Sequence, residues 1–294
     1  MKISVLIPAY QAAATLSRAL ASVQAQTHRD WDLYVVEDGS RDGAEEIVRR
    51  LARAETRAVR YENLGRNQGV AAARNRLLAL AADAVAFLDA DDWWAPGHLA
   101  AGLELLDGGA GLVATGVQTF DLASGRNLQE VHPPRGLVGA PATTLFRQSA
   151  IITSSSVFLS RALILRTGDF DPVFTVGEVR DYWLRAALGG ARFAVAPGLT
   201  CHYAKHPRSA MGRTLVVAAE NVRFYDKYRP NAALPAAARR HLLARSLITE
   251  GRLLRATRPR ASARLLWRAW RLAPYHVAAA AHLLLSGLRS LLPS

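Results

Sequence analysis

Three aspartates at the end of one apolar segment are the residues best suited to chemistry. Asp89, Asp91 and Asp92 flank Ala90 directly after the apolar run 84–88, which is short and bounded and so predicts a buried strand. Clustered carboxylates repel one another, and a divalent cation relieves that repulsion. Oxygen ligands suit Mg²⁺ or Mn²⁺, which bridge phosphates. The sequence therefore predicts a metal–diphosphate site where this strand ends.

Two other loops follow apolar runs in the same way. They contain Pro8, Ala9, Tyr10, Glu37 and Asp38. Each loop alone could be an ordinary turn, but open α/β sheets bind ligands outside the carboxyl ends of their strands. We therefore expect the three loops to line one crevice, where Tyr10 supports a planar base or ribose and Asp38 accepts hydrogen bonds from the base or ribose.

The segment 67–75 opens a helix just before the carboxylate strand and contains Asn67, Gly69 and Arg74. Gly69 permits close backbone approach. Arg74, one turn into the helix, is placed to pair with aspartate carboxylates or with a phosphate. The alternative is a surface arginine.

The elements that must position these loops alternate between strand and helix patterns over residues 1–120. This order predicts an α/β fold with a mostly parallel, Rossmann-like sheet and helices on both faces. Strand patterns also occur at Ser154–Leu159, Phe193–Val195 and Leu199–Tyr203. The pattern after about Met211 is entirely helical.

Half of the residues are apolar, which excludes a disordered chain, and the single cysteine, Cys201, excludes an internal disulfide and fits a reducing compartment. No signal peptide is expected, because the chain opens directly with a strand pattern. The net charge is +13. From Arg239 onward there are eleven arginines and one acid, so most of this charge lies in the helical tail.

The order of these motifs, Pro-Ala-Tyr, Val-Glu-Asp-Gly-Ser, Asn-Gln-Gly-(x)4-Arg-Asn and Asp-Ala-Asp-Asp, resembles the family 2 glycosyltransferases, which have the GT-A fold. The resemblance covers roughly residues 1–210, although the family usually has Asp in place of Glu37. It implies that Asp91 holds Mg²⁺ or Mn²⁺ on the diphosphate of a nucleotide sugar. The nucleotide-sugar site that it implies contains Pro8, Ala9, Tyr10, Glu37, Asp38, Asn67, Gly69, Arg74, Asp89 and Ala90.

The acceptor region implied by the resemblance contains Glu178 and Asp181. The family's general base falls on Val179 in an ungapped match, and valine cannot act as a base. Asp181 is our preferred base and Glu178 the alternative, while a purely structural role at a helix N-terminus remains open for both. His206, in a segment that resembles the family's Tyr-Arg-x-His, is expected at the metal or diphosphate.

The resemblance implies an inverting, metal-dependent glycosyltransferase that moves a sugar from a nucleotide-diphosphate sugar to an acceptor hydroxyl. We expect a saccharide or lipid-linked acceptor and a role in cell-surface polysaccharide or glycoconjugate synthesis. We expect a catalytic domain over residues 1–210, divided into a nucleotide-sugar-binding half (1–120) and an acceptor-binding half (121–210), and a helical extension over 211–294. The alternatives are a catalytically silent nucleotide-binding or scaffold protein, motivated by Val179, and, ranked third, a nucleotidyltransferase.

Arginines and tryptophans recur at helical spacing in the tail, at Arg264, Trp267, Arg268, Trp270 and Arg271. Such a helix suits an anionic membrane surface. A helical cap on the catalytic domain is an equal interpretation and is compatible with membrane contact. Nucleic acid is not expected, because no known nucleic-acid motif accompanies the charge. We therefore expect a cytoplasmic protein, peripheral on the inner face of the cell membrane.

Overall fold

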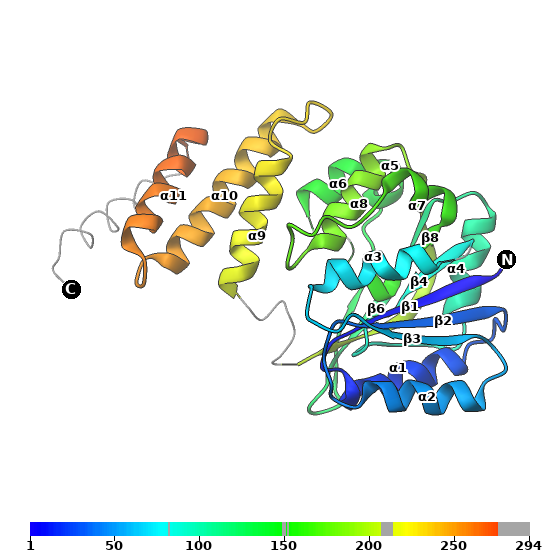
Figure 1. Ribbon diagram of the computed structural model, residues 1–294. Helices are drawn as coiled ribbons and strands as arrows, with labels where there is room; N and C mark the ends of the chain where they lie inside the picture. Colours follow the sequence, from blue (N-terminus) through cyan, green and yellow to red (C-terminus); the bar gives the residue numbers. More distant parts are fainter. Residues whose placement is uncertain (82, 149–150, 152, 207–213, 276–294) are drawn as a thin grey trace. The chain divides into compact units, whose positions relative to one another are not determined.

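Figure 1 shows a computed structural model of the chain, which describes residues 1–81, 83–148, 151, 153–206 and 214–275. The chain divides into two compact units, Met1–Pro207 and Arg208–Ser294. They are described separately below.

The described residues of the first unit form a nine-stranded sheet with the order β3-β2-β1-β4-β8-β6-β9-β5, and β7 pairs with β6. Strands β1 to β4 run parallel, β6 is parallel to β9, and β5, β7 and β8 are antiparallel to their neighbours. The strands are β1 (Ile3–Ala9), β2 (Trp31–Glu37), β3 (Val59–Asn63), β4 (Ala84–Phe87), β5 (Trp93–Trp94), β6 (Leu112–Asp121), β7 (Asn127–Val131), β8 (Val157–Ser160) and β9 (Phe193–Lys205).

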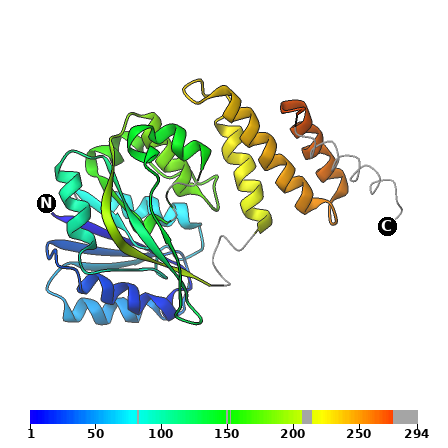
Figure 2. The ribbon, with the colours of Figure 1, turned by 180° about the vertical axis from the view of Figure 1, so that it is seen from behind.

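Helices cover both faces of this sheet, as Figure 2 shows from behind. They are α1 (Ala13–Gln24), α2 (Ala44–Ala54), α3 (Val70–Leu80), α4 (His98–Asp107), α5 (Gly136–Gly139), α6 (Pro141–Arg147), α7 (Arg161–Thr167) and α8 (Glu178–Leu188), with a 3-10 turn, η1, at Ser154–Ser156. The prediction of an α/β fold with a mostly parallel sheet and helices on both faces is confirmed.

The alternation of side chains along β1 explains why the sheet needs two helical layers. Ile3, Val5 and Ile7 are fully buried in one core cluster, which also contains apolar residues of α1, α2 and α4. Leu6, fully buried as well, points to the opposite face, because successive strand residues alternate. On that face Phe87 of β4 makes an edge contact with Phe170, with ring centroids 5.7 Å apart.

The structure differs from the predicted elements in three places. Residues 154–156, expected as the start of a strand, form η1, and the strand begins only at Val157. The two strands expected between Phe193 and Tyr203 are one long strand, β9, whose pairing with β6 is irregular near Gly116. The third difference is strand β5, which was not predicted, because its two residues are too few to give a sequence pattern.

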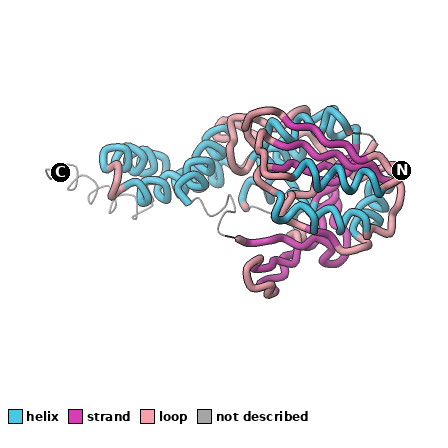
Figure 3. The backbone as a smooth tube through the Cα atoms, turned by 60° about the horizontal axis from the view of Figure 1, so that its bottom comes forward, coloured by secondary structure: helices cyan, strands magenta, loops and turns pink. Residues whose placement is uncertain are grey.

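The described part of the second unit contains α9 (Thr214–Lys227), α10 (Ala236–Leu254) and α11 (Pro259–Leu272). Helix α10 contacts both of the others, and the tube in Figure 3 shows this unit as helices and loops. None of the helices among the described residues combines the length and the apolar character that crossing a bilayer requires.

Candidate active site

The three predicted loops meet at one edge of the sheet. Strand β1 pairs in parallel with both β2 and β4, so the carboxyl ends of the three strands are adjacent. Backbone hydrogen bonds also connect the residues that follow these strands. The amide of Asp38 donates to the carbonyl of Ala9 at 2.8 Å. The amide of Leu88 likewise donates to the carbonyl of Leu6 at 2.9 Å.

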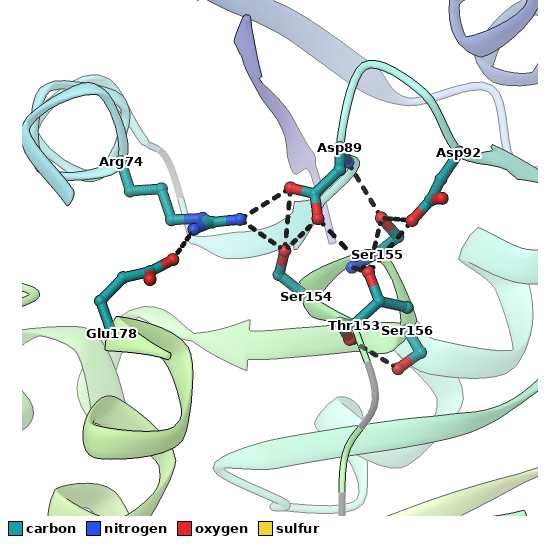
Figure 4. A network of polar contacts seen from close by, with 8 residues as sticks. All are labelled: Arg74, Asp89, Asp92, Thr153, Ser154, Ser155, Ser156 and Glu178. Atoms are coloured by element: carbon teal, nitrogen blue, oxygen red, sulfur yellow. Dashed lines mark hydrogen bonds and ion pairs between the residues drawn. The ribbon is translucent and has the colours of Figure 1, made fainter. Parts of the chain in front are cut away.

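Arg74 connects two of the predicted segments in a buried network (Figure 4). Only 4% of this residue is exposed. One guanidinium nitrogen, Nη2, donates to Asp89 at 2.7 Å and to the Ser154 hydroxyl at 2.9 Å, and Nη1 pairs with Glu178. The side chain therefore joins α3, the loop after β4 and the first turn of α8, and the surface-arginine alternative is wrong.

A run of hydroxyl side chains in and before η1 holds the carboxylates and was not predicted as part of the site. The Ser154 hydroxyl donates to both oxygens of Asp89 at 3.0 Å, and the Ser155 hydroxyl donates to Asp92 at 2.6 Å. Thr153 also donates to Asp92, at 3.0 Å. The available sequence signal was four consecutive hydroxyl residues, Thr153 to Ser156, directly before an apolar strand.

Asp92 is fully buried and acts as a structural anchor. Besides the two hydroxyls, it accepts a hydrogen bond from the amide of Ala204 in β9 at 3.0 Å. Burial, together with the charges of Asp91 and Asp89, raises the pKa of Asp92 well above its ordinary value. Of the three clustered aspartates, Asp92 therefore faces the protein, and Asp89 and Asp91 are the partly exposed members.

Asp91 and His206 form the part of the site suited to a cation. His206 Nε2 lies 2.9 Å from Asp91 Oδ2, and Arg18 donates to the carbonyl of Asp91 at 2.9 Å while stacking on the Trp93 ring. Burial and the neighbouring Asp89 raise the pKa of Asp91, and the contact with His206 opposes this.

Among the described residues, no group of three His, Cys, Asp or Glu side chains converges to form a complete metal site. Mg²⁺ commonly takes one or two protein carboxylates and completes its coordination with substrate phosphates and water. The Asp91 carboxylate and the His206 imidazole fit such an open site, in which a diphosphate supplies further ligands.

The residues predicted to bind the nucleotide have different surroundings. Tyr10 is 48% exposed and so is available to a ligand. Glu37 is fully buried and accepts a hydrogen bond from the Ser40 hydroxyl, and burial raises the pKa of Glu37. Pro8, Ala9 and Ala90 are buried beside these loops.

Asp38 holds the neighbouring loop through its carboxylate. Its two oxygens accept hydrogen bonds from the amides of Gln68 and Gly69, at 2.7 and 2.8 Å.

The backbone at Gly39 lies close to the same neighbouring loop. Gly39 has a positive φ of +81°, and a Cβ there would lie 2.2 Å from the backbone carbon of Arg66. The β2–α2 loop and the exposed turn that contains Asn67 thus pack backbone to backbone, and contact of Asp38 with a nucleotide remains a prediction.

The two carboxylates considered as the base lie in different surroundings on α8. Glu178, 4% exposed, contacts Arg74 within the network of Figure 4. Burial raises the pKa of Glu178, although Arg74 opposes the shift. Asp181 is fully buried and accepts a hydrogen bond at 2.9 Å from Arg185, which also donates to the carbonyls of Thr167 and Asp169.

Comparison with known families agrees with this arrangement. The family model for glycosyl transferase family 2 matches residues 4–164, more than half of the chain. The chain belongs to glycosyl transferase family 2. The family resemblance read from the motifs is therefore confirmed.

One relative is an Escherichia coli protein named UDP-Glc:alpha-D-GlcNAc-diphosphoundecaprenol beta-1,3-glucosyltransferase WfgD, 34% identical over 93 residues. The match covers 31% of this chain and 36% of that protein. The chain thus spans well under two thirds of the length of the curated relatives that it matches.

Two solved structures share the fold. Residues 1–349 of TarS from S. aureus, in complex with UDP-GlcNAc, match with a TM-score of 0.70 and 19% identity, over 97% of this chain and 89% of that one. The mannosyltransferase PcManGT from Pyrobaculum calidifontis, in complex with GDP-Man and Mn²⁺, matches with a TM-score of 0.63 and 21% identity, over 99% and 87%. The expected GT-A fold is therefore confirmed.

Proposed function

We propose that this family 2 glycosyltransferase is inverting and metal-dependent, and that it moves a sugar from a nucleotide-diphosphate sugar to an acceptor hydroxyl. The observation that supports this most is the network of Arg74, Asp89 and Glu178 next to the Asp91–His206 pair, at the carboxyl ends of β1, β2 and β4. The site brings together carboxylates, a guanidinium and an imidazole. Negative carboxylates suit the metal, and the positive guanidinium suits the diphosphate.

Asp91 and His206 are the proposed holders of Mg²⁺ or Mn²⁺. When bound, the metal supplies positive charge that stabilises the leaving diphosphate. The contribution of Arg74 is to orient Asp89, because its guanidinium donates to both Asp89 and Ser154. Tyr10 is the proposed support for the nucleotide, since its ring is half exposed next to the end of β1.

We propose Glu178 as the general base in place of Asp181. Glu178 shares Arg74 with Asp89 and so belongs to the site, and its raised pKa moves it toward the range in which a carboxylate exchanges protons near neutrality. In this role it takes the proton of the acceptor hydroxyl, which attacks the anomeric carbon opposite the leaving group. Asp181 is proposed to position α8, because Arg185 ties it to the 167–169 segment.

The donor and acceptor classes are proposed from the similar proteins. TarS and PcManGT are described in complex with UDP-GlcNAc and GDP-Man, and the name of WfgD specifies a lipid-linked diphosphate acceptor. We therefore propose a nucleotide-sugar donor, a saccharide or lipid-linked acceptor, and a role in polysaccharide or glycoconjugate synthesis.

A panel of UDP- and GDP-sugars, scored by thermal unfolding with and without Mn²⁺, tests this proposal. A ligand at about one hundred times its Kd adds about 2.7 kcal/mol, which raises Tm by roughly 5–10 °C for a unit of this size. Asp91→Asn is expected to lose the Mn²⁺-dependent part of the shift. If no nucleotide sugar raises Tm under either condition, the proposal is wrong.

A catalytically silent relative stays the second candidate, because an ungapped match to the family pattern places Val179 at the position of the general base. A donor that binds tightly but is turned over neither to acceptors nor to water, by the unmodified protein, would favour this alternative.

A further inference from the structure

The net charge of the protein lies entirely in its second unit. Residues 208–294 contain sixteen basic and three acidic side chains, a net charge of +13, whereas residues 1–207 contain twenty-one of each sign. Helix α11 contains four arginines and no acidic residue. A local excess of this size attracts an anionic partner.

The large side chains on one side of α11 are basic and aromatic, and we call this side the arginine–tryptophan face. Arg260, Arg264, Trp267 and Arg271 follow one another at spacings of three or four residues, so they share one side of the helix, with Trp270 at its margin. All five are exposed; Trp267 is 49% exposed and Trp270 42%.

The opposite side of α11 packs within the unit. Ser262, Leu266 and Ala269 are buried there, and the Ser262 hydroxyl donates to the carbonyl of Gly251 in α10 at 2.6 Å. Leu266 lies so close to Gly251 that a Cβ at that glycine would be 2.9 Å from it. This packing against α10 fixes which side of α11 is exposed.

The charges of the arginine–tryptophan face are not neutralised within the described part of the protein. Arg268, beside this face, forms an ion pair with Asp226 of α9. Among the described residues, Arg260 and Arg264 have no ion-pair partner, and Arg271 lies over the Trp267 ring at 4.8 Å. The three guanidinium groups and the two indole rings of this face are therefore available to one anionic partner.

We propose that the arginine–tryptophan face binds the anionic headgroups of a lipid bilayer, with α11 lying in the plane of the interface. Arginine donates to phosphate in a bidentate manner, and tryptophan partitions to the level of the headgroups. A bilayer surface satisfies both kinds of side chain along one face of one helix. The proposal is independent of the proposed glycosyl transfer, although a lipid-linked acceptor would be presented at the same surface.

The test is flotation of the full chain with phosphatidylcholine vesicles, with and without phosphatidylglycerol. Binding is expected only with the anionic lipid and is expected to weaken as salt rises. Each arginine near an anionic surface contributes about a fivefold factor, so Arg260→Gln/Arg264→Gln/Arg271→Gln is expected to lose roughly one-hundred-fold in partitioning. Trp267→Ser/Trp270→Ser is expected to lose about tenfold or more.

The matched control removes the same charge from the first unit, with Arg50→Gln/Arg126→Gln/Arg135→Gln at exposed arginines. This variant should bind like the unmodified protein, and unchanged thermal unfolding shows that each variant is folded. An equal loss in the control, equal binding to neutral vesicles, or binding to an RNA oligomer but not to anionic vesicles would overturn the proposal. None of these readouts uses donor, metal or turnover, so failure here leaves the proposed enzymatic function untouched.

Discussion

Replacing Glu178 by glutamine separates catalysis from binding at the proposed site. Glutamine keeps an oxygen that can accept from Arg74, while the guanidinium retains Asp89 at 2.7 Å and Ser154 at 2.9 Å. We therefore expect a stability loss of about 1–2 kcal/mol, the cost of weakening one hydrogen bond to a charged group. Glutamine cannot take the proton of the acceptor hydroxyl.

The catalytic loss should be much larger than the structural one. A positioned general base contributes about 10²–10⁴ in rate, equivalent to roughly 3–5.5 kcal/mol. The assay is release of nucleoside diphosphate from the donor that the thermal panel selects, with calorimetry to measure the Kd of that donor. We expect kcat to fall by that factor and the Kd to stay within about threefold.

Asp181→Asn is the matched control, since it removes one carboxylate charge one turn further along α8. Asp181 is fully buried and its partner Arg185 retains the carbonyls of Thr167 and Asp169. We expect about 1–3 kcal/mol of destabilisation and nearly unchanged kcat in the folded variant. A fall of about one-hundred-fold in Asp181→Asn with little change in Glu178→Gln would refute the assignment and restore Asp181 as the base.

Two further substitutions and one pH dependence test local features of the structure. Gly39→Ala should cost about 2–4 kcal/mol in thermal unfolding, because the new Cβ would meet the Arg66 backbone and φ is +81°; an unchanged Tm would contradict the close packing. Ser154→Ala should weaken binding of Mn²⁺ with nucleoside diphosphate by about fivefold in calorimetry, because Asp89 loses a hydroxyl donor, and equal affinity would show that Ser154 does not orient it. Burial lowers the pKa of His98 to about 3, so the stability due to its neutral form is complete above about pH 6.5 and is lost as the pH falls toward 3. Between pH 8 and pH 5 the unmodified protein should lose about 2 kcal/mol more in urea unfolding than His98→Gln, and parallel losses would contradict this.

The central sheet could be predicted because its signals are local. The apolar runs of β1, β2 and β4 end at polar loops, and the parallel order follows from the helices between them. The pairing of Arg74 with an aspartate was likewise predictable from the motif order. Strand β5 was missed because its pairing partners, Cys201 and His202, are more than one hundred residues away in the sequence.

The supporting contacts of the site could not be predicted in the same way. Whether Asp92 faces a ligand or the protein is decided by Ser155 and Ala204, which come from distant segments. The sequence indicated an acceptor at Asp38 but did not show that the amides of Gln68 and Gly69 donate to its two oxygens. Such partners are set by tertiary packing, and hydroxyl residues alone are a weak sequence signal.

The role of Asp91 is best measured by calorimetric titration of a nucleoside diphosphate with and without Mn²⁺, on the unmodified protein and on Asp91→Asn. We expect Mn²⁺-enhanced binding that falls by about tenfold or more in Asp91→Asn, because the proposed metal loses its carboxylate ligand. Binding with equal affinity in both proteins, or binding that is indifferent to Mn²⁺, would contradict the assignment of Asp91 to a metal–diphosphate site.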